Sequence, residues 1–155
     1  MTHKRNALLT GAGLALAMLG SPAHASLGAP HASVDTDRAA MHAQRHTTLH
    51  GQYQVEQLAL GNGAYVQEYV NGNDAVFAIS WHGRAMPKLR QLLGSYAERA
   101  ATGIHAYHAA HGPLGGAVVS SADFMLQANG RMGSFFGRAW LPAQLPPGTD
   151  ESAIQ

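Results

Sequence analysis

Residues 75–100 read AVFAISWHGRAMPKLRQLLGSYAERA, and the hydrophobic pattern changes once inside this stretch. Residues 75–81 are almost all apolar, so they predict a central strand that is covered on both sides, or on one side with small residues on the other. Pro87 suits the first position of a helix. Beyond it, apolar residues recur at spacings of three and four, which predicts a helix with one buried face; they are Leu89, Leu92, Leu93, Tyr96, Ala97 and Ala100.

The segment before this stretch predicts a hairpin. Residues 53–60 and 64–70 alternate apolar and polar side chains, and a Gly-Asn-Gly turn at residues 61–63 separates them. Residues 71–74, Asn-Gly-Asn-Asp, form a second turn sequence, because the Asn-Gly pair tolerates a positive φ. We therefore expect three successive antiparallel strands.

The segment after the helix predicts a further hairpin. Gly103 is the expected end of the helix, and residues 117–128 and 131–142 are expected strands that flank Asn129-Gly130, a strong hairpin signal. Gly133 and Gly137 predict bulges or a bend in the last strand. The order β-β-β-α-β-β predicts an α+β domain: an antiparallel sheet of about five strands with one main helix packed on it.

The first 25 residues have the pattern of a secretory signal peptide. Lys4 and Arg5 precede an apolar run at residues 7–19, and Ala-His-Ala at residues 23–25 fits signal peptidase. We expect cleavage between Ala25 and Ser26 and export to the periplasm or out of the cell. The apolar run is short for a bilayer, so no stable membrane span is expected after cleavage. An uncleaved N-terminal anchor is the alternative.

The remaining 130 residues are enough for one domain with one core. We expect a flexible leader at residues 26–48, a single α+β domain at residues 49–142 and a proline-rich tail at residues 143–155. Without the signal the ten basic residues fall to eight, against nine acidic ones, and no basic cluster indicates a nucleic-acid partner. The absence of cysteine excludes disulfides and thiol or iron–sulfur chemistry.

Two blocks of the chain resemble a known family. EYVNGNDAVFAISWHGRAMPKLRQLLGSY at residues 68–96 and ANGRMGSFFGRAWLPAQLPPG at residues 128–148 are similar to the small exported bacterial proteins of the domain of unknown function 2844 family. The similarity extends over residues 52–155. The resemblance implies export and a shared fold, and it carries over no catalytic residue. The residues that carry it are Val76, Phe77, Trp81, Gly83, Pro87, Leu89, Leu92, Leu93, Gly94, Tyr96, Gly137, Arg138, Ala139, Pro142 and Pro146.

Residues 103–112, GIHAYHAAHG, concentrate histidine. At the helical period His105, His108 and His111 lie on one face, where imidazoles can bind zinc, copper or nickel. No carboxylate or cysteine lies nearby to complete the ligand set. The alternative is a short helix that packs on its alanines, Ala106, Ala109 and Ala110, with solvated histidines on its outer face. A pH-dependent binding role for the histidines is a third possibility.

Two enzymatic interpretations are weaker. Glu56 and Glu68 are expected to face one another across the first hairpin, but such carboxylates are more often solvated strand residues than an acid/base pair. The chain has no Gly-x-Ser-x-Gly elbow, and Ser95 lies within the predicted helix. A hydrolase would therefore need a triad assembled from distant residues, with His82 as its base.

The aromatic residues of the predicted strands are the last candidate for a binding surface. Tyr65 and Tyr69 are expected on one face of their strand, and most of the strand aromatics (Phe77, Trp81, Phe135, Phe136 and Trp140) are expected in the core. Any that line an open sheet face would form an apolar binding surface. The sequence thus favours an exported, non-enzymatic module without a cofactor that binds a protein or small-molecule partner through its sheet. A zinc- or copper-binding protein and a hydrolase are the alternatives.

Overall fold

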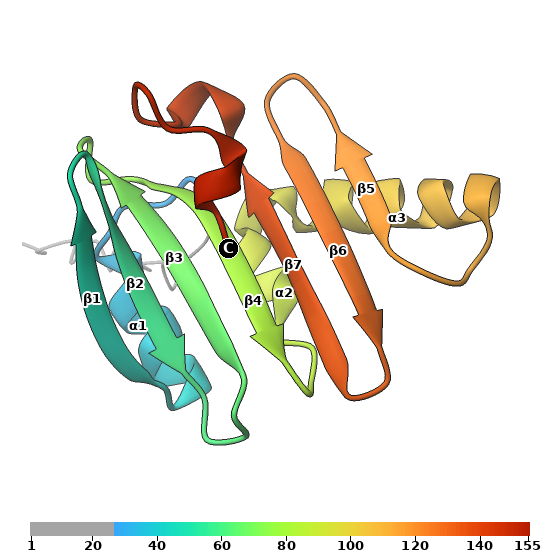
Figure 1. The fold of residues 1–155 in the computed structure, drawn as a ribbon, viewed down its shortest axis with the longest axis horizontal. Helices are drawn as coiled ribbons and strands as arrows, with labels where there is room; N and C mark the ends of the chain where they lie inside the picture. The colour runs from blue at the N-terminus through green and yellow to red at the C-terminus, as the bar shows by residue number, and fades with distance from the viewer. Residues whose placement is uncertain (1–26) are drawn as a thin grey trace, which may run out of the picture.

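A computed structural model describes residues 27–155 and shows one sheet with its α-helices on one face (Figure 1). The seven strands are antiparallel, in the order β1-β2-β3-β4-β7-β6-β5. They are β1 (Gln44–His50), β2 (Tyr53–Ala59), β3 (Tyr65–Asn71), β4 (Val76–Gly83), β5 (Ala117–Ser120), β6 (Met125–Arg131) and β7 (Ser134–Trp140). The helices are α1 (Ser33–Met41), α2 (Leu89–Leu93), η1 (Gly94–Tyr96), α3 (Ala97–His111), η2 (Pro142–Gln144) and η3 (Glu151–Ala153).

The predicted α+β class is confirmed, but the sheet has seven strands instead of about five. One additional strand is β1, which lies with α1 in the segment expected to be a flexible leader, so that expectation was wrong. Six of the seven β1 side chains are exposed, so the strand has no apolar alternation to reveal it. Backbone pairing with β2 along its whole length and the contact of Arg45 with Glu56 stabilise it.

The other additional strand comes from residues 117–128, which form two strands, β5 and β6. Between them Phe124 is fully buried, and the Ser121 hydroxyl donates to its carbonyl at 2.8 Å. The hairpin turn after β6 also differs from the prediction: Arg131 pairs with Ser134, so Asn129-Gly130 lies within the strand. The turn is Met132-Gly133, where Gly133 has the positive φ of 85° that a second turn position requires.

The helical region continues beyond its predicted end. α3 passes through Gly103 and ends at His111. Gly103 lies against β5, where a Cβ would be 2.7 Å from the Val119 methyl groups, so the glycine serves close packing and does not end the helix. The regular helix is interrupted earlier, at Gly94, whose φ of 52° ends α2. The six apolar residues predicted to form the buried face all belong to the core or pack against it.

The main core lies between the helices and the sheet. β4 is the central strand and is buried at every position except His82, as its apolar sequence predicted. Trp81 points toward the helices and is 2% exposed. Its indole packs over Gly137 of β7, where an added Cβ would lie 2.3 Å from Trp81 Cζ2. We predicted a bulge or a bend at Gly137, but the strand pairing is regular there. The glycine instead leaves room for the Trp81 indole.

The C-terminal segment lies on the opposite face of the sheet, in front of β3, β4 and β7 in Figure 1. Ile154 is 1% exposed and packs in a second core cluster that includes Tyr69 and Trp140. The hydroxyls of Ser80 and Tyr69 donate to the main-chain oxygen of Gln155 at 2.6 and 2.9 Å. The proline-rich segment is therefore an integral part of the domain.

The predicted signal peptide, residues 1–25, and its cleavage site lie outside the described residues. Within residues 27–155, no helix is both long and apolar enough to cross a bilayer.

Candidate functional site

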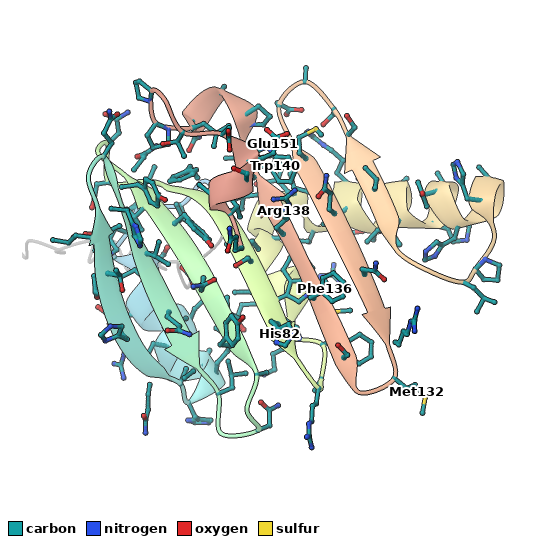
Figure 2. The ribbon with its side chains drawn as sticks, viewed as in Figure 1. His82, Met132, Phe136, Arg138, Trp140 and Glu151 are labelled. Atoms are coloured by element: carbon teal, nitrogen blue, oxygen red, sulfur yellow. The ribbon has the colours of Figure 1, made fainter. Side chains whose placement is uncertain are left out.

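The C-terminal segment covers only part of its sheet face, and the remainder is open to solvent. We define the open face as the side chains that β2, β3, β4, β6 and β7 present beside and below that segment. Figure 2 shows three of them, His82, Phe136 and Arg138, on the front of the sheet. Strand pairing assigns to this face the residues used below, which are Gln57, Tyr65, Gln67, His82, Gln127, Asn129, Arg131, Phe136 and Arg138.

Three rings form a row across the open face. Tyr65 pairs with His82, and His82 pairs with Phe136, so adjacent strands β3, β4 and β7 each contribute one ring. The Tyr65 and His82 rings stack, with centroids 5.5 Å apart and planes 27° apart. Phe136 is 46% exposed, and His82 is also exposed. The row therefore presents flat ring surface to solvent on interior strands of the sheet.

Arg138 connects the open face to the C-terminal segment. Its Nε donates to Gln127 Oε1 at 3.0 Å, and one terminal nitrogen donates to the carbonyls of Glu151 and Ile154 at 2.6 and 3.1 Å. Its guanidinium also lies over the Trp140 ring, 5.3 Å from the centroid. The charge of Arg138 is thus used to hold the segment in place.

A hollow of about 610 Å³ lies at this end of the sheet. Strand alternation assigns its lining to both faces, with Tyr65, His82 and Phe136 on the open face and Trp81 and Gly137 on the helix face. The open face therefore contributes a ring-lined depression that is exposed to solvent.

Glu56 is buried on the helix face of β2. It pairs with Glu68 across the first hairpin, as the sequence predicted, but it is not solvated: its exposed fraction is 0%. Burial raises the pKa of Glu56, but hydrogen bonds from Arg45 Nε at 2.7 Å, from the Thr47 hydroxyl at 2.6 Å and from His31 outweigh it and lower this pKa to about 2. Glu56 is therefore the charged centre of an internal hydrogen-bond network.

Glu68 lies beside this network on β3 and is 1% exposed. Its burial, together with the charge of Asp37 and a hydrogen bond with it, raises the pKa of Glu68 to about 9. Gln91 of the helical region also donates to Asp37. The sequence led us to expect two solvated carboxylates on these strands, but both are buried between the sheet and the helices. With these pKa values Glu56 is ionised and Glu68 is protonated at neutral pH.

The raised pKa of Glu68 predicts a specific dependence of stability on pH. Because the folded protein binds this proton more tightly than the unfolded chain, the Glu68 contribution is complete below pH 4.5 and is lost as the pH rises toward 9. The loss is at most about 1.4 kcal/mol per pH unit. We expect Glu68→Gln to remove this dependence and to be more stable than the wild type at pH 9. Urea unfolding at pH 5, 7 and 9 measures the free energy of unfolding of both proteins. If this free energy changes with pH to the same extent in the wild type and in Glu68→Gln, the raised pKa of Glu68 is contradicted.

The three predicted histidine ligands lie along the last turns of α3. His105 and His111 are exposed and His108 is half-buried. The His111 ring stacks on Tyr107 at a centroid distance of 4.2 Å, and its Nδ1 donates to the Tyr107 carbonyl at 2.9 Å. Within residues 27–155, no three His, Cys, Asp or Glu side chains are grouped as a metal site.

The helix around these histidines packs differently from the prediction. Ala106, Ala109 and Ala110 were expected to face the protein but are exposed. The contacts with the sheet come from Gly103, which packs against Val119, and from Ile104, which packs against the main core.

The structure also places the residues considered for a hydrolase. His82 stacks on Tyr65, and in the described part of the chain no hydrogen bond or ion pair joins it to a carboxylate or a serine. Ser95 lies in η1 and is exposed. The geometry therefore brings no nucleophile and base together at His82.

These features define a class: an α+β domain with a seven-stranded antiparallel sheet, helices on one face and a second face half-covered by the C-terminal segment. The sequence model of the family described as "Protein of unknown function (DUF2844)" matches residues 23–154, and the chain belongs to this family. Comparison with curated proteins and with solved structures finds no match.

Proposed function

We propose that this protein is a binding module that holds its ligand or partner on the open face. The observation that carries the proposal is the row of Tyr65, His82 and Phe136, which presents ring surface to solvent from three interior strands. Aromatic side chains lose a large apolar area from water when a ligand covers them, so an exposed row favours binding.

The rest of the fold supports this assignment. The helices occupy the other face of the sheet, and the C-terminal segment is anchored beside the rings by Arg138. The rings therefore project from a rigid sheet, which keeps the entropy cost of binding low. The exposed residues of the open face, unlike the enclosed Glu56 and Glu68, are accessible to a ligand.

Binding to a panel of three ligand classes tests the proposal. Neutral oligosaccharides, extended peptides and lipid vesicles are titrated calorimetrically into the purified protein. We expect at least one class to bind and Phe136→Ala to weaken that binding at least tenfold. Leu49→Ala is the matched control, because Leu49 is 77% exposed but lies on β1 at the sheet edge. Absence of binding by every class, or equal loss in both variants, would overturn the proposal.

The histidines of α3 give a separate prediction. Because His111 is held by Tyr107 and no grouped ligand set exists in the described residues, we expect zinc and copper to titrate identically into the wild type and into a variant with His105, His108 and His111 replaced by alanine. Calorimetry measures both. Submicromolar binding that the triple replacement abolishes would establish the metal-binding alternative.

We also propose that the protein is exported and that cleavage occurs between Ala25 and Ser26. The basic start, the short apolar run and the Ala-His-Ala sequence support this proposal. Intact-mass measurement of the protein from its native host should give a chain that begins at Ser26. A chain that retains Met1 would contradict it.

A further inference from the structure

The polar side chains around the ring row restrict the chemistry of the ligand. On the seven strands, the side chains that share a face with Phe136 include no Asp or Glu. They include the amides Gln57, Gln67, Gln127 and Asn129. Arg138 is half-buried and already bound to carbonyls, and Arg131 lies one row beyond the rings at the hairpin. The ring row is thus bordered by uncharged amides, with the engaged Arg138 in the row on one side and Arg131 in the row on the other.

Two of these amides have their orientation fixed by their partners. Gln127 accepts from Arg138 Nε, and Asn129 accepts from the main-chain N–H of Gly130 at 2.8 Å. Both partners are donors only, so the amide oxygen must face each of them. The NH₂ groups of Gln127 and Asn129 are then available to a ligand, because within residues 27–155 they donate no hydrogen bond to another residue. The open face therefore offers free, uncharged donors beside the rings.

A peptide strand does not suit this position. Strand addition needs unpaired backbone groups at a sheet edge. The rings lie on β3, β4 and β7, which are paired on both sides, so their backbone groups are already used. The ligand must be held by ring faces and side-chain amides.

From this donor set we propose that the open face binds an uncharged oligosaccharide, an inference that rests on the proposed function of this face. The apolar faces of the sugar rings cover Tyr65, His82 and Phe136, which span two strand spacings, about 10 Å. The sugar hydroxyl oxygens accept hydrogen bonds from the NH₂ groups of Gln127 and Asn129. An acidic sugar would lose hydration of its carboxylate, and the Arg138 guanidinium next to the ring row is already engaged by the carbonyls of Glu151 and Ile154.

Native electrophoresis in gels that contain a soluble polysaccharide tests the inference. The probes are the neutral polymers laminarin, xylan and hydroxyethylcellulose, and the acidic polymer polygalacturonate. We expect at least one neutral polymer to retard the wild-type protein, and polygalacturonate not to. Phe136→Ala should weaken retardation at least tenfold, and Leu49→Ala should leave it unchanged.

The variant Asn129→Asp tests the contribution of the amide donor independently of the rings. The aspartate keeps an oxygen that accepts from Gly130 and replaces the free NH₂ donor with a second, negatively charged acceptor oxygen, so the local backbone contact is retained while the donor is lost. We expect a three- to tenfold weaker interaction with the neutral polymer, which is the usual effect of one lost hydrogen bond.

The outcomes distinguish the inference from the proposed function. If all neutral polymers fail, or only polygalacturonate retards the protein, the oligosaccharide is excluded. If peptides or vesicles then bind and Phe136→Ala removes that binding, the open face is still a binding surface. If no class binds there, both proposals fail.

Discussion

Replacing Gly137 with alanine is expected to destabilise the protein by about 3 kcal/mol. The new Cβ would lie 2.3 Å from Trp81 Cζ2 and 2.6 Å from the Gln127 carbonyl, so neither neighbour has room for it. Because Trp81 is 2% exposed in the main core, its indole can move only by displacing other core side chains. Overpacking of this kind costs about 1–3 kcal/mol, and a backbone atom among the clashing neighbours favours the upper end.

Urea unfolding of the variant measures this effect. Gly61→Ala is the matched control, since nothing lies within 4 Å of a Cβ at that position. A Gly137→Ala variant as stable as the control would show that Trp81 does not pack over Gly137.

Replacing Glu56 with alanine is the second large effect. It leaves Arg45, Thr47 and His31 without the carboxylate that accepts from them between the sheet and α1. Loss of one member of a buried ion pair costs about 3–5 kcal/mol, and we expect about 3 kcal/mol because the Arg45 side chain is 22% exposed. The depressed pKa adds a second signature: the stability due to Glu56 should be lost as the pH falls from 4.5 toward 2.

Two controls make this prediction specific. Asp123→Ala breaks the exposed pair with Arg99 and should change stability little, because solvent screens such pairs. Glu56→Leu combined with Arg45→Met removes both charges and should recover much of the loss. A double variant less stable than Glu56→Ala alone would show that the pair itself, and not the unpaired Arg45, determines the effect.

The parts of the fold that the sequence predicted are those with a strong local signal. The unbroken apolar run of β4 and the helical periodicity after Pro87 both gave the correct element. β1 was missed because its stability depends on pairing with β2 and on the Arg45–Glu56 contact, which are not local. The docked C-terminal segment was missed for the same reason, since it is held by contacts between residues distant in sequence, such as Tyr69 with Gln155.

The candidate site was predicted only in outline. The sequence placed Tyr65 on the same face as Tyr69, and it left open which strand aromatics would be exposed. The tertiary structure decides this, because the C-terminal segment covers Trp140 and leaves Phe136 in solvent. The burial of Glu56 and Glu68 was likewise invisible, since a polar residue on a strand normally indicates the solvated face.

Amide chemical-shift mapping during titration with the ligand that binds most tightly is the most direct test of the open face as the binding surface. The account predicts that the largest changes occur in β4, β6 and β7 around His82, Phe136 and Asn129, with α1 and β1 unaffected. Changes confined to α3 or to the helix face of the sheet would contradict it.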